Sequence, residues 1–76
     1  MRGTVRLKDA GDAIGRSLEH PEVQTISGLV VALLGRPAAI GDAVTWNGVR
    51  IEVTAVSGRG VADTALTYRT PPRTDG

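Results

Sequence analysis

The sequence predicts an α+β domain in which two helices pack on one face of a small antiparallel sheet. Apolar residues recur every three or four positions in the first half of the chain, which is the period of a helix. In the second half they alternate with polar residues, as in strands, around an Asn-Gly pair at 47–48. A chain of 76 residues has room for one domain. The predicted order β-α-α-β-β-β occupies residues 1–68, and the polar, proline-containing segment 69–76 is a predicted disordered tail.

The first two predicted elements are a short strand and a helix. Residues Gly3 to Leu7 alternate weakly, which predicts a strand or an extended lead-in. The helix is indicated by the apolar spacing of Leu7, Ala10, Ile14 and Leu18. Asp9 is its expected N-cap, and Asp12 is expected to pair with Arg16 one turn later. Pro21 is expected to end the helix, because the residue before a proline avoids helical angles.

The second helix has the strongest local signal. Its apolar residues Ile26, Leu29, Val30, Leu33 and Leu34 follow the helical period. Thr25 is the expected N-cap, and Gly35 stands where a left-handed glycine closes a helix. No residue of this helix is charged, so we expect even its back to be covered.

The next two elements are predicted to form a hairpin from residues 43–46 and 49–56. Asn47-Gly48 is the favoured pair for a two-residue type I′ turn, which sets Val44 opposite Ile51. One face then carries Val44, Trp46, Val49, Ile51 and Val53, and the other carries Thr45, Arg50, Glu52 and Thr54. The hydrophobic pattern and the turn therefore predict the same register.

A third strand is predicted at 61–68, with Val61 opposite Val56. This register places Ala62, Thr64, Leu66 and Tyr68 on the apolar face of the sheet, and Val61, Asp63, Ala65 and Thr67 on the polar face. It also sets Asp63 opposite Thr54. Two helices are then available to cover the apolar face, which defines a two-layer domain.

Few side chains are suited to chemistry, and we expect no catalytic residue, no metal site and no cofactor. His20 is the single histidine and cysteine is absent, so the usual nitrogen and sulfur ligands of a metal set are missing. Ser27 falls on a helix and Ser57 opens a turn, and neither lies in a Gly-x-Ser-x-Gly nucleophile motif. These observations predict a domain that is not an enzyme.

Arg50, Glu52 and Asp63 share the polar face of the predicted sheet, and they form the interaction surface that we expect. A site for calcium or magnesium needs a denser set of oxygen ligands than these residues supply. An unpaired sheet edge readily recruits another strand, so a homodimer is a further possible partner arrangement.

The charge pattern argues against two classes of partner. Nine basic and eight acidic residues are interspersed and give a net charge of +1, without the basic footprint of a nucleic-acid-binding protein. The longest uncharged stretch, 23–35, is too short to cross a bilayer, so we expect a soluble chain that does not insert into a membrane.

Three stretches in their order along the chain resemble the transporter-associated domain family called CorC/HlyC. The matching positions are Gly3-Thr4-Val5-Arg6-Leu7, then Thr25, Gly28, Leu34-Gly35-Arg36 and Gly41-Asp42, and then Trp46-Asn47-Gly48 with the strand that follows. Ser27 stands where the family has the first glycine of a pair, Pro37 comes one place early, and Ile51 replaces a common aromatic residue. The family also has one more strand upstream of Gly3.

The resemblance implies a non-catalytic C-terminal regulatory domain of a membrane ion transporter. Its parents are hemolysin-like proteins linked to magnesium and cobalt efflux, and their other parts, a membrane domain and a pair of CBS domains, are the implied partners. The implied location is the cytoplasmic side of the plasma membrane. The family fold is likened to a subdomain of FAD-binding enzymes, which leaves a flavin- or small-molecule-binding module as the alternative. That alternative rests on fold analogy alone, and fold does not carry function.

Overall fold

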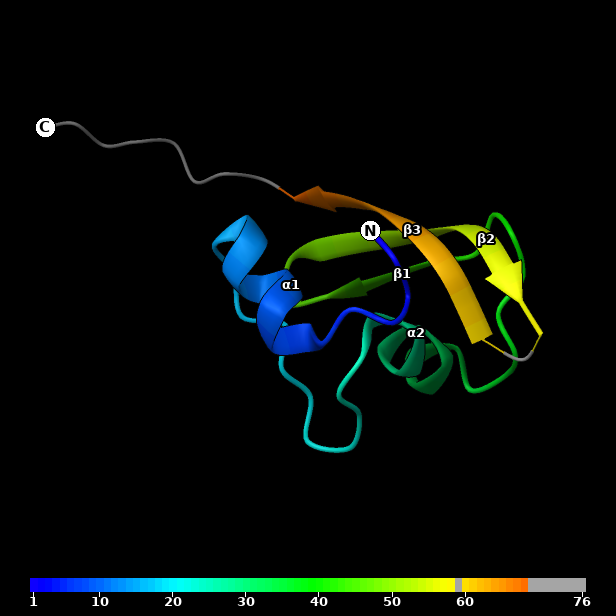
Figure 1. The fold of residues 1–76 in the computed structure, drawn as a ribbon, viewed down its shortest axis with the longest axis horizontal. Helices are drawn as coiled ribbons and strands as arrows, with labels where there is room; N and C mark the ends of the chain where they lie inside the picture. The colour runs from blue at the N-terminus through cyan, green and yellow to red at the C-terminus, as the bar shows by residue number, and fades with distance from the viewer. Residues whose placement is uncertain (59, 69–76) are drawn as a thin grey trace, which may run out of the picture.

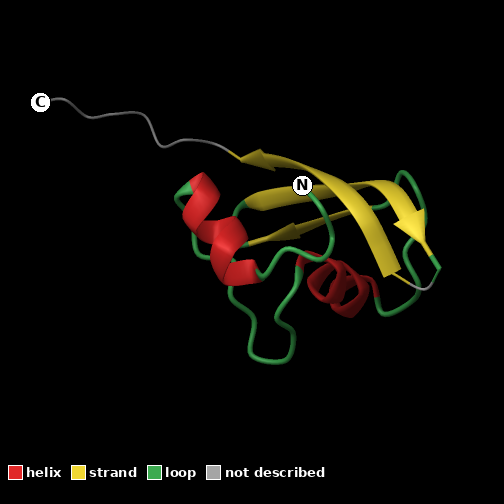
Figure 2. Cartoon of the chain, viewed as in Figure 1, coloured by secondary structure: helices red, strands yellow, loops and turns green. Residues whose placement is uncertain are grey.

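A computed structural model describes residues 1–58 and 60–68, which form two helices and three strands. The elements are α1 (Leu7–Ile14), α2 (Ile26–Leu34), β1 (Ala43–Trp46), β2 (Val49–Ser57) and β3 (Gly60–Tyr68). The strands form one antiparallel sheet in the order β1-β2-β3, and both helices lie on the same side of it (Figures 1 and 2). The predicted α+β class is confirmed. The predicted tail at 69–76 lies outside the described residues.

The hydrophobic core lies between the helices and the sheet. Its fully buried members are Leu7, Ala10, Leu18, Ile26, Leu29, Val30, Val49, Ile51 and Val53, joined by Val61. Val, Ile, Leu and Ala alone build this cluster, as the absence of phenylalanine in the sequence requires. Trp46 packs against the rim of the cluster and is partly buried.

Helix α2 begins and ends as predicted. The Thr25 side chain accepts a hydrogen bond from the Gly28 amide at 3.1 Å, and Gly35 takes the left-handed conformation with φ 69°. The expectation that its back is fully covered is wrong. Ala32 is exposed and Val31 is only half-buried, because the sheet contacts one side of the helix and the opposite side faces outward.

Helix α1 differs from its prediction at both ends. It begins at Leu7 with Arg6 in the N-cap position and no side-chain cap, so Asp9 lies inside the first turn. It ends at Gly15, six residues before Pro21, because Gly15 adopts a left-handed conformation with φ 71°. Arg16 is consequently outside the helix, and its predicted pairing with Asp12 is not among the ion pairs of the described residues. Leu18 is buried, but from the segment after the helix.

The hairpin has the predicted turn and register. Asn47 and Gly48 both have positive φ, 53° and 79°, as a type I′ turn requires. Val44 lies opposite Ile51, and Thr45 lies opposite Arg50. The Asn47 side-chain amide also donates to the Ser17 carbonyl at 2.7 Å, which ties the turn to the segment after α1.

Strand β3 pairs with β2 as predicted at both ends but not in the middle. Val61 lies opposite Val56 and Thr64 lies opposite Val53, yet an irregularity at Ala55 places that residue, and not Thr54, opposite Asp63. The shift turns Val61 inward, where it is 4% exposed, so its predicted place on the polar face is wrong. A bulge adds twist and re-aims side chains in this way.

The predicted strand at Gly3–Leu7 is wrong as a continuous strand. The segment instead makes two isolated bridges, Arg2 with Asp63 and Arg6 with Thr25. It therefore crosses from the outer edge of β3 to the start of α2 (Figure 1). Gly3 sits at the crossing, where an added Cβ would fall on the Val61 carbonyl oxygen. The close approach of two backbones explains the glycine.

Candidate interaction surfaces

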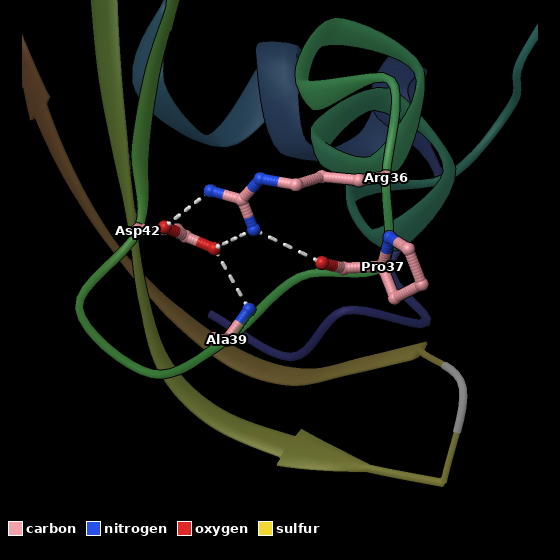
Figure 3. A network of polar contacts seen from close by, with 4 residues as sticks. All are labelled: Arg36, Pro37, Ala39 and Asp42. Atoms are coloured by element: carbon pink, nitrogen blue, oxygen red, sulfur yellow. Dashed lines mark hydrogen bonds and ion pairs between the residues drawn. The ribbon is translucent and has the colours of Figure 1, made fainter.

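A bidentate ion pair between Arg36 and Asp42 closes the loop from α2 to β1 (Figure 3). The two guanidinium nitrogens donate to the two carboxylate oxygens, each at 2.9 Å. The same carboxylate accepts the Ala39 amide at 2.8 Å, and the guanidinium reaches the Pro37 carbonyl at 3.2 Å. The planar guanidinium fits this fork geometry and a lysine ammonium does not.

The two charges of this pair act mainly on each other. The Arg36 guanidinium and then the Ala39 amide hold the pKa of Asp42 below its usual range, and Asp42 in turn raises the pKa of Arg36. The loop therefore presents little net charge. Ile40 lies within it and is 67% exposed, the largest exposure among the large apolar residues of the described chain.

The predicted motif residues hold the backbone and do not converge on one site. Thr25 and Gly28 begin α2, and Gly35 ends it. Gly41 has φ 94° and donates its amide to the Val53 carbonyl, next to Asp42 at the start of β1. Asn47 and Gly48 form the hairpin turn. All seven positions serve turns, caps or the loop ion pair, which are structural roles.

The structure divides the predicted interaction surface into two parts. Arg50 and Glu52 form an ion pair on β2 at 3.1 Å, with 54% and 44% of their side chains exposed. Asp63 lies on β3, where it contacts the amino group of Met1 at 3.0 Å and accepts the Thr64 amide. Hydrogen bonds from that amino group and that amide lower the pKa of Asp63. Both helices lie on one side of the sheet (Figure 2). Arg50 and Glu52 alternate along β2 with residues buried against the helices, so their ion pair lies on the other side.

His20 and Ser27 both serve the fold. His20 lies 4.9 Å from Trp46 between ring centroids, and its Nδ1 accepts the Glu22 amide at 3.0 Å. Ser27 accepts the Val61 amide at 2.9 Å. Sequence reasoning missed the His20–Trp46 contact, because 25 residues, including all of α2, separate the two side chains along the chain. The buried Trp46 Nε1 is the one buried side-chain polar atom without a partner in the described chain.

The N-terminus of α2 is occupied by the chain itself. The amides of Ile26 and Ser27 donate to the carbonyls of Val5 and Gly3, and the Gly28 amide donates to Thr25. Such amides bind phosphates at helix N-termini in nucleotide-binding proteins. Here these three donors are engaged, so the first turn of α2 has no free amide among them for a phosphate.

The residues described here contain no cluster of three or more His, Cys, Asp or Glu side chains suited to a metal ion. Neither described helix has the length and apolar character needed to span a membrane.

The fold is a small two-layer α+β domain, with two helices on one side of a three-stranded sheet. A family model described as "Transporter associated domain", CorC_HlyC, matches residues 1–67. The chain therefore belongs to the CorC_HlyC transporter-associated domain family. A search of curated proteins gave no match.

Two solved structures show the same fold. A transporter-associated CorC_HlyC domain from Nitrosomonas europaea superposes with a TM-score of 0.82 at 18% identity, over 91% of this chain and 84% of that one. A CorC_HlyC domain from Haemophilus ducreyi gives a TM-score of 0.79 at 17% identity, over 92% and 86% of the two chains. At these identities the similarity concerns the fold.

Proposed function

We propose that this chain is a non-catalytic regulatory domain that modulates ion transport by binding other parts of a membrane transporter. The observation that carries the proposal is the family match over residues 1–67. The polar side chains support it, because two candidates for chemistry, Ser27 and His20, are engaged in backbone hydrogen bonds. Magnesium and cobalt are the proposed ions, and a CBS pair and a membrane domain on the cytoplasmic side are the proposed neighbours.

The proposed contact surface is the side of the sheet away from the helices, centred on Arg50 and Glu52. Both side chains are about half exposed and their ion pair is open to solvent. Exposed ion pairs add little stability, so these charges can change partner at low cost. A domain influences transport only if it contacts two states of the transporter differently. Charges at the rim of an interface contribute to such selectivity.

Ion efflux tests the proposal. Cells that carry the complete transporter are compared with cells in which this domain has been removed, at matched expression. We expect efflux, or its dependence on intracellular magnesium, to change. Unchanged transport would contradict a regulatory role. The alternative, a small-molecule-binding module, would then be tested by a search for ligands.

A charge exchange tests the surface. The double variant Arg50→Glu/Glu52→Arg keeps an internal pair but exchanges the two charges on this face. The matched control, Lys8→Glu/Asp9→Lys, exchanges two exposed charges on α1. We expect the first variant to alter efflux and the control to leave it unchanged. Equal effects of both variants would exclude this face as the contact.

A further inference from the structure

Within the part of the chain that the structure describes, the N-terminal segment closes one edge of the sheet and no segment pairs with the other edge. At the outer edge of β3, Met1 and Thr64 exchange backbone hydrogen bonds, and the Gly3 amide donates to the Ala62 carbonyl. The other end strand is β1. Proteins usually cover or charge a free edge because its unpaired amides and carbonyls recruit other strands.

The backbone amides and carbonyls that β1 leaves unpaired at this edge belong to Ala43 and Thr45. The Val53 amide donates to the Asp42 carbonyl, and hydrogen-bonded positions alternate along an antiparallel pair. The backbone amide and carbonyl of Val44 therefore point toward β2, and those of Ala43 and Thr45 point away from it. Within residues 1–58 and 60–68, these outward groups have no backbone partner. Thr45 is also exposed.

We propose that β1 pairs antiparallel with β1 of a second copy of this chain. A two-fold axis through Val44 sets Ala43 of each copy opposite Thr45 of the other copy. The outward amides and carbonyls of the two strands then form hydrogen bonds with each other. This inference goes beyond the proposed function and does not depend on it.

Charge favours a second copy as the occupant of this edge. On a two-fold axis each residue near the axis meets its own equivalent, so a charged edge residue would repel itself. The strand Ala43–Trp46 has no charged residue and no proline. The nearest acidic group, Asp42, is already neutralised by Arg36 in the same copy.

The strand is short, so the dimer is weak. Stable interfaces bury about 1,200–2,000 Å² in total, more than two four-residue strands supply. A covalent trap is therefore the sharpest test, and the chain suits it because it has no cysteine. In the proposed pairing the two Val44 residues form a non-hydrogen-bonded pair with Cα atoms about 4.5 Å apart. That distance lies within the roughly 4.4–6.8 Å that a disulfide spans.

The experiment compares Val44→Cys with Thr54→Cys, an exposed position on β2 away from the edge. Under mild oxidation we expect Val44→Cys to form a disulfide-linked dimer with an unchanged circular dichroism spectrum, and Thr54→Cys to stay mostly monomeric. Cross-linking at equal rates in the two variants would overturn the proposal.

A second measurement needs no cysteine. In an amide NMR dilution series of the unmodified chain, we expect concentration-dependent shifts centred on Ala43 and Thr45. Thr45→Pro removes one outward amide without touching the pairing to β2, and it should abolish those shifts while the fold is retained. Spectra that do not change with concentration, or shifts centred on another surface, would overturn the proposal.

Discussion

The Ser27 hydroxyl accepts a hydrogen bond from the Val61 amide, across 34 residues of sequence, and so joins the first turn of α2 to the start of β3. This contact lies where the strand irregularity has turned Val61 into the core. Ser27 is thus a structural acceptor at the one place where β3 departs from regular pairing.

Replacing Ser27 by alanine should destabilise the fold, because the Val61 amide loses its acceptor at a partly buried site. A buried donor left without a partner costs about 1–3 kcal/mol. Urea unfolding followed by circular dichroism measures the change. Ser57→Ala is the control, since Ser57 is exposed, and its midpoint should stay near that of the unmodified chain. Equal midpoints for the two variants would show that the hydrogen bond contributes nothing.

Replacing Asp42 by alanine should lower the urea midpoint and loosen the loop before β1. The change removes both guanidinium contacts and the acceptor of the Ala39 amide. Arg36→Lys should lower the midpoint less, because it keeps a positive charge but loses the two-pronged geometry. Amide exchange at Ala39 reports the loop directly, and slow exchange in Asp42→Ala would contradict the role assigned to the pair.

Stability should fall in acid. The pKa values of Asp42 and Asp63 are lowered in the folded chain, by Arg36 and by the Met1 amino group respectively. The pKa of aspartate in the unfolded chain is about 3.9. The stabilisation is therefore complete above that pH and is lost as the pH falls through the lower pKa values of the folded chain. Urea midpoints measured from neutral pH downward should decline below about pH 4. In Asp42→Asn the decline should be shallower, and an identical decline would exclude Asp42 as a contributor.

Replacing Gly3 by alanine should disrupt the crossing of the N-terminal segment over β3. The added methyl would fall on the Val61 carbonyl, and backbone atoms cannot move aside as a flexible side chain can. Overpacking of this kind costs about 1–3 kcal/mol. Thr4→Ala, at the exposed neighbouring position, is the control in thermal unfolding. A melting temperature for Gly3→Ala equal to that of the control would mean that the segment detaches at no cost.

Leu29→Ala should be among the most destabilising changes in α2. Leu29 is fully buried, and removing such a side chain costs about 2–5 kcal/mol. Leu33 is only partly buried, so Leu33→Ala should lower the stability less, although both residues belong to the apolar stripe that predicted the helix. Urea midpoints rank the two variants, and the reverse order would contradict the packing described here.

Elements with local signals could be predicted from the sequence. Helix α2 is set by the Thr25 cap, its uncharged apolar run and the Gly35 terminus, all within eleven consecutive residues. The hairpin is set by Asn47-Gly48 and the alternation on either side, which agree on one register. Short-range backbone preferences and side-chain periods decide such elements, so a single sequence suffices.

The contacts between distant segments could not be predicted from the sequence and are seen in the folded structure. The N-terminal residues add to β3 and cap α2, the Asp63 carboxylate pairs with Met1, and Val61 turns inward at an irregular pair. The chain after α1 also folds back on the helix, so that the Arg16 carbonyl lies against Gly11, where a side chain would not fit. These features arise from close backbone approaches and from the twist of the sheet, and neither leaves a periodic trace in the sequence.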